Sequence, residues 1–271
     1  MNCAEKYASI SLRVLVHYIR GGLSRSAAEL AFYLLFSVFP LIMIGHSILS
    51  MIQIPDSVLD QFTALLPSDV QMILASYMRH LRQTASQHIL AVGIILTMFF
   101  MSRAVRSMMH TFREIYRQTE KSSFIYRMIL SVAMTILCIL MILSSLVLIV
   151  FSGRLMEFLQ WFFPQITEML LLWKLAAHMT AVVFLLVFLL VCYRLLPGVQ
   201  MRWREALPGA LTALCGWYFI TRGFALYVDH IAKYSILYGS IGAIIVMMGW
   251  LYISSSILLL GAVFNHELKS H

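Results

Sequence analysis

A run of basic side chains near residue 110 has the spacing of one helix face. Its members, at intervals of three or four residues, are Arg103, Arg106, His110, Arg113 and Arg117. At about 100° per residue, they fall within an arc of roughly 80°. Arginine can bind phosphate or carboxylate through two parallel hydrogen bonds, so this stripe could hold an anionic group. The alternative is an anchor to anionic lipid, which needs positive charge but little order.

The first two arginines of the stripe begin inside an apolar segment, where each charge costs free energy. We therefore predict that Arg103 and Arg106 line a recess open to the cytoplasm and bind an anionic headgroup there. Arg113 and Arg117 are expected to serve as an electrostatic approach. Glu29 is the only acidic residue inside an apolar span, and it would pair with the recess arginines when no ligand is present. Its alternative role is a helix-end acid paired with a neighbouring arginine.

Other polar groups lie in the apolar segments. Glu29, Tyr33, Ser37 and Pro40 share one face of a helix, and Pro40 is expected to kink it because proline removes a backbone hydrogen bond. Arg222 could reach outward to the membrane surface, pair inside the bundle or meet an anionic substrate. The candidate substrate-binding residues are therefore Glu29, Tyr33, Arg103, Arg106 and Arg222.

The sequence carries no motif of a common catalytic or metal site. None of the nine histidines forms an H-x-x-x-H pair, and no cysteines have zinc-binding spacing. A glycine-rich phosphate loop, Ser-x-x-Lys and G-x-S-x-G are absent too. We expect no catalytic residue, metal or cofactor, and this disfavours a nuclease.

The composition indicates which elements position these residues. Apolar residues make up 61% of the 271 positions and charged residues only 12%, about half the share of an ordinary soluble domain. Segments free of charge are long enough to cross a membrane as helices. The prediction is an all-α polytopic membrane protein, one domain over 1–271, with six transmembrane helices near 27–52, 88–108, 128–151, 173–193, 206–228 and 241–264.

Most of the 20 lysines and arginines fall on one side of these spans, which should be cytoplasmic together with both termini. Residues 1–26 would form a cytoplasmic amphipathic segment with an interfacial helix. Short helices are expected outside, between the first two spans. We expect no cleavable signal peptide before the first span and no disulfide. The net charge of +8 indicates anionic membrane lipid as the partner, not nucleic acid.

Small residues recur every seven positions in the last two spans. Such stripes let membrane helices approach closely, so we predict that the two stripes face each other. The alternative is that one of them accepts a bulky lipid or another helix. The residues are Gly209, Gly216 and Gly223 in the fifth span and Gly242, Gly249 and Ser256 in the sixth.

The C-terminal run YGSIGAIIVMMGWLYISSSILLLGAVFNHEL, residues 238–268, resembles the ending of the YihY/BrkB family of bacterial inner-membrane proteins. The segment AAELAFYLLFSVFPLIMI at 27–44 and the LPGA sequence at 207–210 agree with that family. The resemblance implies six helices in the bacterial inner membrane with both termini inside. Relatives carry a virulence-factor label and a ribonuclease label, and a part in moving lipids has been considered. Glu29 departs from the family's small, apolar opening.

The leading hypothesis is a transporter or flippase-like protein for an anionic amphiphile or lipid. Its alternatives are an envelope scaffold or accessory protein that moves nothing and, least favoured, an enzyme. Without an ATP-binding loop, transport would be passive, ion-coupled or driven by a partner. The halves show no clear repeat, which weakens an alternating-access mechanism. Self-association and an envelope partner protein are both left open by the sequence.

Overall fold

The computed structural model describes residues 13–14, 16–51, 87–118, 123–162, 169–199, 201–230 and 240–269. All regular structure in these ranges is helical, which confirms the predicted all-α class. The short helices expected outside lie beyond the described residues. Six long helices form the bundle: α2 (Leu23–Met51), α5 (Gln87–Ile115), α6 (Phe124–Phe162), α7 (Met169–Leu195), α8 (Trp203–His230) and α10 (Ser240–Lys269).

Within the described residues, five helical segments are long and apolar enough to cross a membrane. They are Leu23–Gly45, Leu90–Ile115, Phe124–Ser144, Trp203–Val228 and Ile241–Lys269. Helix α7 has 27 residues, and the apolar segment found in its described part is Met179–Leu195. A polytopic helical membrane protein is therefore confirmed, while the sixth span and the orientation stay predictions.

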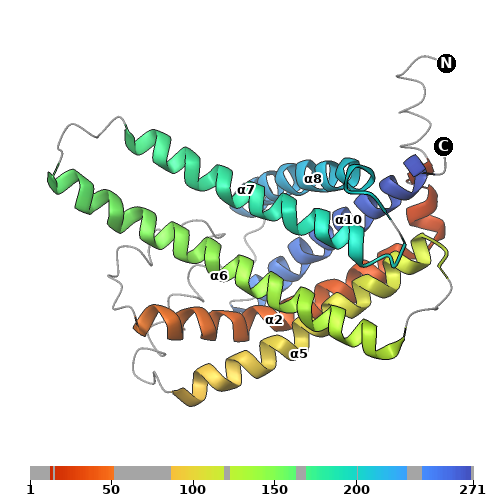
Figure 1. The fold of residues 1–271 in the computed structure, drawn as a ribbon, viewed down its shortest axis with the longest axis horizontal. Helices are drawn as coiled ribbons and strands as arrows, with labels where there is room; N and C mark the ends of the chain where they lie inside the picture. Colours follow the sequence, from red (N-terminus) through yellow and green to blue (C-terminus); the bar gives the residue numbers. More distant parts are fainter. Residues whose placement is uncertain are drawn as a thin grey trace.

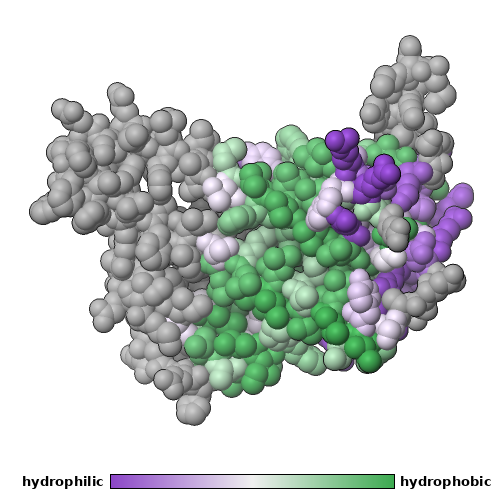
Figure 2. All heavy atoms as spheres, in the orientation of Figure 1, coloured by the Kyte–Doolittle hydropathy of each residue, from purple (hydrophilic) through white to green (hydrophobic). Residues whose placement is uncertain are grey.

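Successive helices run in opposite directions, so α2 begins at the end of the bundle where α10 finishes (Figure 1). Helix α2 packs on α5 and α10, α8 packs on α10 and α7, and α6 joins α5 to α7. Many large apolar side chains are exposed, including Phe219, Ile95 and Leu226. Figure 2 shows them as a wide apolar belt, with hydrophilic side chains gathered at the end where α10 finishes. Such a surface is suited to lipid rather than water.

The described part of the predicted amphipathic segment lies against α10. Residues 16–20 are helical, and a turn at Gly21 and Gly22 leads into α2. Gly22 has a φ of 65°, a conformation that favours glycine. The Tyr18 hydroxyl donates to Ser256 Oγ at 2.9 Å, and His17 Nδ1 lies 3.0 Å from Glu267 Oε1. This segment is therefore attached to the bundle by specific polar contacts.

An asparagine connects α8 to α10. Pro208 lies inside α8 and has no N–H, so it interrupts the hydrogen bonding of that helix. Asn265 of α10 is buried beside this break. Its Oδ1 accepts from the Gly209 N–H at 2.7 Å, and its Nδ2 donates to the Ala206 carbonyl at 3.1 Å. Two backbone groups near the proline thereby gain partners from the neighbouring helix.

The glycine stripe of α8 only partly faces α10. A Cβ on Gly209 would collide with the backbone of Gly261, so close contact requires glycine there. A Cβ on Gly216 would lie 3.0 Å from Ile257 of α10. One on Gly223 would meet no described residue within 4 Å. The first two glycines therefore pack against α10, and the third has no close neighbour in the described part of the chain.

The stripe of α10 does not oppose the stripe of α8, and this differs from the prediction. A Cβ on Gly249 would lie 3.8 Å from Phe224, and Ser256 bonds to Tyr18 of the N-terminal segment. Gly242 is buried. The two helices are neighbours, as expected, but the glycines of one stripe pack against other residues of the partner helix and not against the other stripe. A seven-residue repeat defines a stripe on each helix without fixing which way that stripe points.

Candidate functional site

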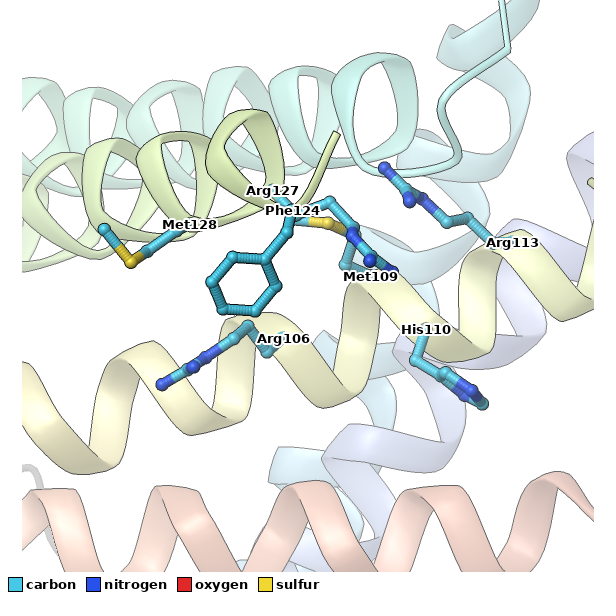
Figure 3. Close-up of a pocket in the computed structure, with 7 residues that line it drawn as sticks. All are labelled: Arg106, Met109, His110, Arg113, Phe124, Arg127 and Met128. Carbon is cyan, nitrogen blue, oxygen red and sulfur yellow. The ribbon is translucent and has the colours of Figure 1, made fainter. Parts of the chain in front are cut away.

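A basic pocket lies between the end of α5 and the start of α6 (Figure 3). Its volume is about 210 Å³, and it is partly open. Among the described residues that line it are three arginines, a histidine and three apolar side chains, and none of these lining residues is acidic. The lining residues are Arg106, Met109, His110, Arg113, Phe124, Arg127 and Met128.

The helical repeat explains why these residues converge. Arg106, Met109 and Arg113 lie at i, i+3 and i+7 on α5, so they share one face. Phe124 and Arg127 lie one turn apart in the first turns of α6. The connection between α5 and α6 is short, which makes the two helices antiparallel neighbours. Two half-sites, one on each helix, are thereby brought together.

The side chains of the pocket differ in exposure. Arg106 is exposed, and its Nε donates to the Ser102 carbonyl at 3.3 Å. Figure 3 shows the Phe124 ring of α6 facing Arg106 of α5. His110 lies at the edge, with its Nδ1 3.7 Å from Glu114 Oε2. The site thus combines an accessible guanidinium with an aromatic surface.

Arg113 is buried, although the sequence prediction made it a peripheral approach residue. Its side chain is 7% exposed and lies under the turn between α7 and α8. A Cβ on Gly198 would lie 3.4 Å from Arg113 Nε, and Gly198 has a φ of 71°. Glycine at this position lets the turn pass close to the guanidinium. Because Arg113 is near the α5 C-terminus, its charge is also favoured by the helix dipole.

The predicted binding residues do not all gather at this pocket. Arg103 is exposed and outside the lining, and its guanidinium lies over the Phe99 ring at 5.5 Å from the centroid. Glu29 is exposed on α2 and makes no ion pair within the described part of the chain. The expected pairing of Glu29 with Arg103 or Arg106 is therefore not present. Only Arg106 of the five candidates lines the pocket.

The remaining candidates lie elsewhere. Tyr33 is half-buried on α2. Arg222 is exposed on α8, with its guanidinium 5.8 Å from the Tyr218 ring centroid. Pro40 is buried within α2, which continues as one helix from Leu23 to Met51. Arg117 lines a separate open recess with Arg13, His17, Arg20 and Glu267.

Sequence reasoning missed the α6 side of the pocket, which Phe124, Arg127 and Met128 form. Arg127 is the last basic residue before a long charge-free stretch, and the prediction used it only to orient the helices. Its position at the start of a span, opposite a basic stripe, was the available signal. Among the described residues, no group of three or more histidines, cysteines or acids could hold a metal ion.

Comparisons with known proteins identify the family to which the chain belongs. The sequence model described as Virulence factor BrkB matches residues 14–271. The ribonuclease-like protein YfkH of Bacillus subtilis is 29% identical over 245 residues, covering 90% of this chain and 89% of that protein. The UPF0761 membrane protein Nmul_A0452 of Nitrosospira multiformis is 26% identical over 268 residues, covering 95% of this chain and 60% of that protein.

A UPF0761 membrane protein of Pseudoalteromonas atlantica is 26% identical over 273 residues, covering 97% of this chain and 87% of that protein. No solved structure matches the chain. The family match extends over nearly the whole sequence, and the helices have the length and apolar surface of membrane spans. The chain is therefore a multi-pass membrane protein that belongs to the BrkB family.

Proposed function

We propose that this protein binds an anionic amphiphile in the bacterial inner membrane and moves it between leaflets, with the basic pocket as its headgroup site. The observation that carries the proposal is the convergence of Arg106, Arg113 and Arg127 from two helices on one pocket. Arginine binds phosphate and carboxylate groups well. A positive charge at membrane depth costs free energy unless it interacts with an anionic or polar partner. Phe124 and Met128 supply an apolar wall for the first part of a chain.

The headgroup step can be tested with a fluorescent phosphatidic acid as probe. The protein is reconstituted in phosphatidylcholine nanodiscs, and probe binding is measured for Arg106→Gln and Arg127→Gln. Each lost charge-assisted hydrogen bond contributes about 1.5–3 kcal/mol, so each variant should bind at least tenfold more weakly. Binding by the natural sequence should also weaken with added salt.

Arg103→Gln is the matched control, because Arg103 lies on the same helix but outside the pocket. It should retain the affinity of the natural sequence. Equal losses in Arg103→Gln and Arg106→Gln would indicate a general electrostatic anchor and contradict the headgroup site.

Movement requires a separate measurement. Proteoliposomes carrying a fluorescent phosphatidic acid are treated with a reductant that reaches only the outer leaflet. With the natural sequence present, the fraction of the fluorescent phosphatidic acid that is bleached should exceed the fraction that lies in the outer leaflet. Arg106→Gln should abolish that increase. Binding without any increase would contradict transport and favour a scaffold that holds lipid.

A further inference from the structure

A second basic recess lies at the end of the bundle where α10 finishes. Its volume is about 390 Å³, and it is open to the outside. Three parts of the chain line it: the N-terminal segment before α2, Arg117 just after α5, and Glu267 near the end of α10. Among the described lining residues, Arg13, Arg20 and Arg117 are arginines and Glu267 is the one acid. The positive charge of these arginines therefore exceeds the charge of the carboxylate.

The carboxylate of the recess already has a partner, whereas two of the arginines do not. His17 Nδ1 lies 3.0 Å from Glu267 Oε1. Arg20 and Arg117 are exposed, and neither guanidinium forms an ion pair within the described part of the chain. Two like charges that line one recess repel each other, and an anion between them would offset that repulsion.

Arg117 also has a backbone conformation that ordinarily selects glycine. It is the one non-glycine residue with a positive φ, 51°, in the described part of the chain. The Gln118 N–H donates to the Arg113 carbonyl at 2.9 Å, and the Arg117 N–H donates to the Glu114 carbonyl at 3.0 Å. This pair of bonds is the Schellman ending of a helix, in which glycine usually occupies the position of Arg117. Arginine costs free energy there that glycine would avoid, and such costs concentrate at functional sites.

We propose that this recess binds a phosphate group, held between Arg20 of the N-terminal segment and Arg117 at the end of α5. Each guanidinium can donate two parallel hydrogen bonds to phosphate oxygens, and Arg13 adds positive charge to the recess. The same contacts suit the phosphate of a membrane lipid and that of a soluble molecule. The recess shares no lining residue with the proposed headgroup pocket, so it is a second site.

Bound phosphate would join the N-terminal segment to α5, and this added attachment provides the readout. Hydrogen–deuterium exchange of the backbone amides at 16–20 is measured by mass spectrometry, with the protein in phosphatidylcholine nanodiscs. In one arm, inorganic pyrophosphate is added to the solution; in the other, phosphatidic acid replaces a growing share of the phosphatidylcholine. We expect exchange to slow in a saturable manner. Slowing by phosphatidic acid alone assigns a lipid headgroup, slowing by pyrophosphate alone assigns a soluble phosphate compound, and slowing by both assigns a site that takes either. No saturable slowing in either arm would overturn the proposal.

Arg117→Gly separates the role of the side chain from that of the backbone. Glycine adopts a φ of 51° without strain and removes the guanidinium. Without added phosphate, this variant should unfold at the same temperature as the natural sequence or at a higher one. Its affinity for the probe that slowed exchange should fall at least tenfold, the loss of a hydrogen bond between charged groups, and Arg20→Gln should have a similar effect. Arg25→Gln is the matched control, because Arg25 is exposed at the start of α2 but lies outside the recess, and it should retain the natural affinity.

Two results from the variants would also overturn the proposal. A lower unfolding temperature for Arg117→Gly would mean that the arginine serves the fold itself, through the helix dipole at the end of α5. Equal losses of affinity in Arg20→Gln and Arg25→Gln would indicate general attraction of anions to this end of the bundle. Arg106→Gln should leave the slowed exchange at 16–20 unchanged, so failure of the headgroup pocket and failure of this recess are distinguishable.

Discussion

Replacing Asn265 by leucine should destabilise the contact between α8 and α10. Leucine has the same number of side-chain heavy atoms but removes both hydrogen bonds, to the Gly209 N–H at 2.7 Å and to the Ala206 carbonyl at 3.1 Å. The change therefore removes the polar interaction and keeps a branched side chain in its place. It also removes the side-chain partner of a backbone N–H beside Pro208.

The magnitude follows from the two bonds. Hydrogen bonds between membrane helices contribute about 0.6 kcal/mol on average and about 1.7 at most, so two of them give roughly 1–3 kcal/mol. Asn265 is 1% exposed, and water cannot readily replace the lost partner. A buried unsatisfied donor costs about 1–3 kcal/mol, which favours the upper part of the range. We expect a loss of about 2–3 kcal/mol in the free energy of unfolding.

The assay is unfolding in mixed micelles of increasing sodium dodecyl sulfate content, followed by circular dichroism. Ser144→Ala serves as the control, because it removes only a local bond from Ser144 Oγ to the Met141 carbonyl and should change the unfolding free energy by less than about 0.5 kcal/mol. If Asn265→Leu were as stable as the natural sequence, the reasoning would be refuted. The break at Pro208 would then tolerate an unpartnered Gly209 N–H.

Two further predictions concern packing and ionisation. Gly209→Ala should cost about 1–3 kcal/mol because its Cβ meets Gly261, whereas Gly223→Ala, whose Cβ meets no described residue, should be nearly neutral. Equal losses of thermal stability in the two variants would contradict the packing. Burial, with a smaller contribution from Glu205, raises the pKa of Tyr116, whose hydroxyl has no partner among the described residues. Ionisation is thus disfavoured in the fold, and stability should fall as pH rises above about 10. Tyr116→Phe should reduce this alkaline loss and leave stability at neutral pH unchanged or higher; an identical pH dependence would contradict it.

The long apolar segments were sufficient to place the six long helices, because lipid requires both apolar side chains and internal backbone bonding. Their ends were less predictable. The second span was predicted at 88–108, yet α5 continues to Ile115. A gap in charge marks only the hydrocarbon-facing part of a helix, while the helix itself continues through its basic end. The third span shows the same effect, because α6 begins at Phe124 and not at 128.

The candidate site was predicted less fully, because its residues come from two helices. Spacing along α5 correctly grouped Arg106 with Arg113, since a helix fixes which residues share a face. It could not show that Arg113 would be covered by the turn at Gly198, or that Arg103 would lie over Phe99. Those outcomes depend on contacts between elements and on rotamers. The same limit applies to Asn265, whose role beside Pro208 depends on how α10 is rotated against α8.

The basic pocket is separate from an apolar cavity among the spans, and helix α6 contributes to both. Arg127 lines the basic pocket, and Ile142 lines the apolar cavity. At a rise of 1.5 Å per residue, they are about 22 Å apart along α6, a large part of the roughly 30 Å thickness of the hydrocarbon core. A small headgroup held by Arg127 therefore cannot also reach Ile142. Substituting Arg106 or Arg127 should then weaken binding of the charged probe without changing the apolar cavity.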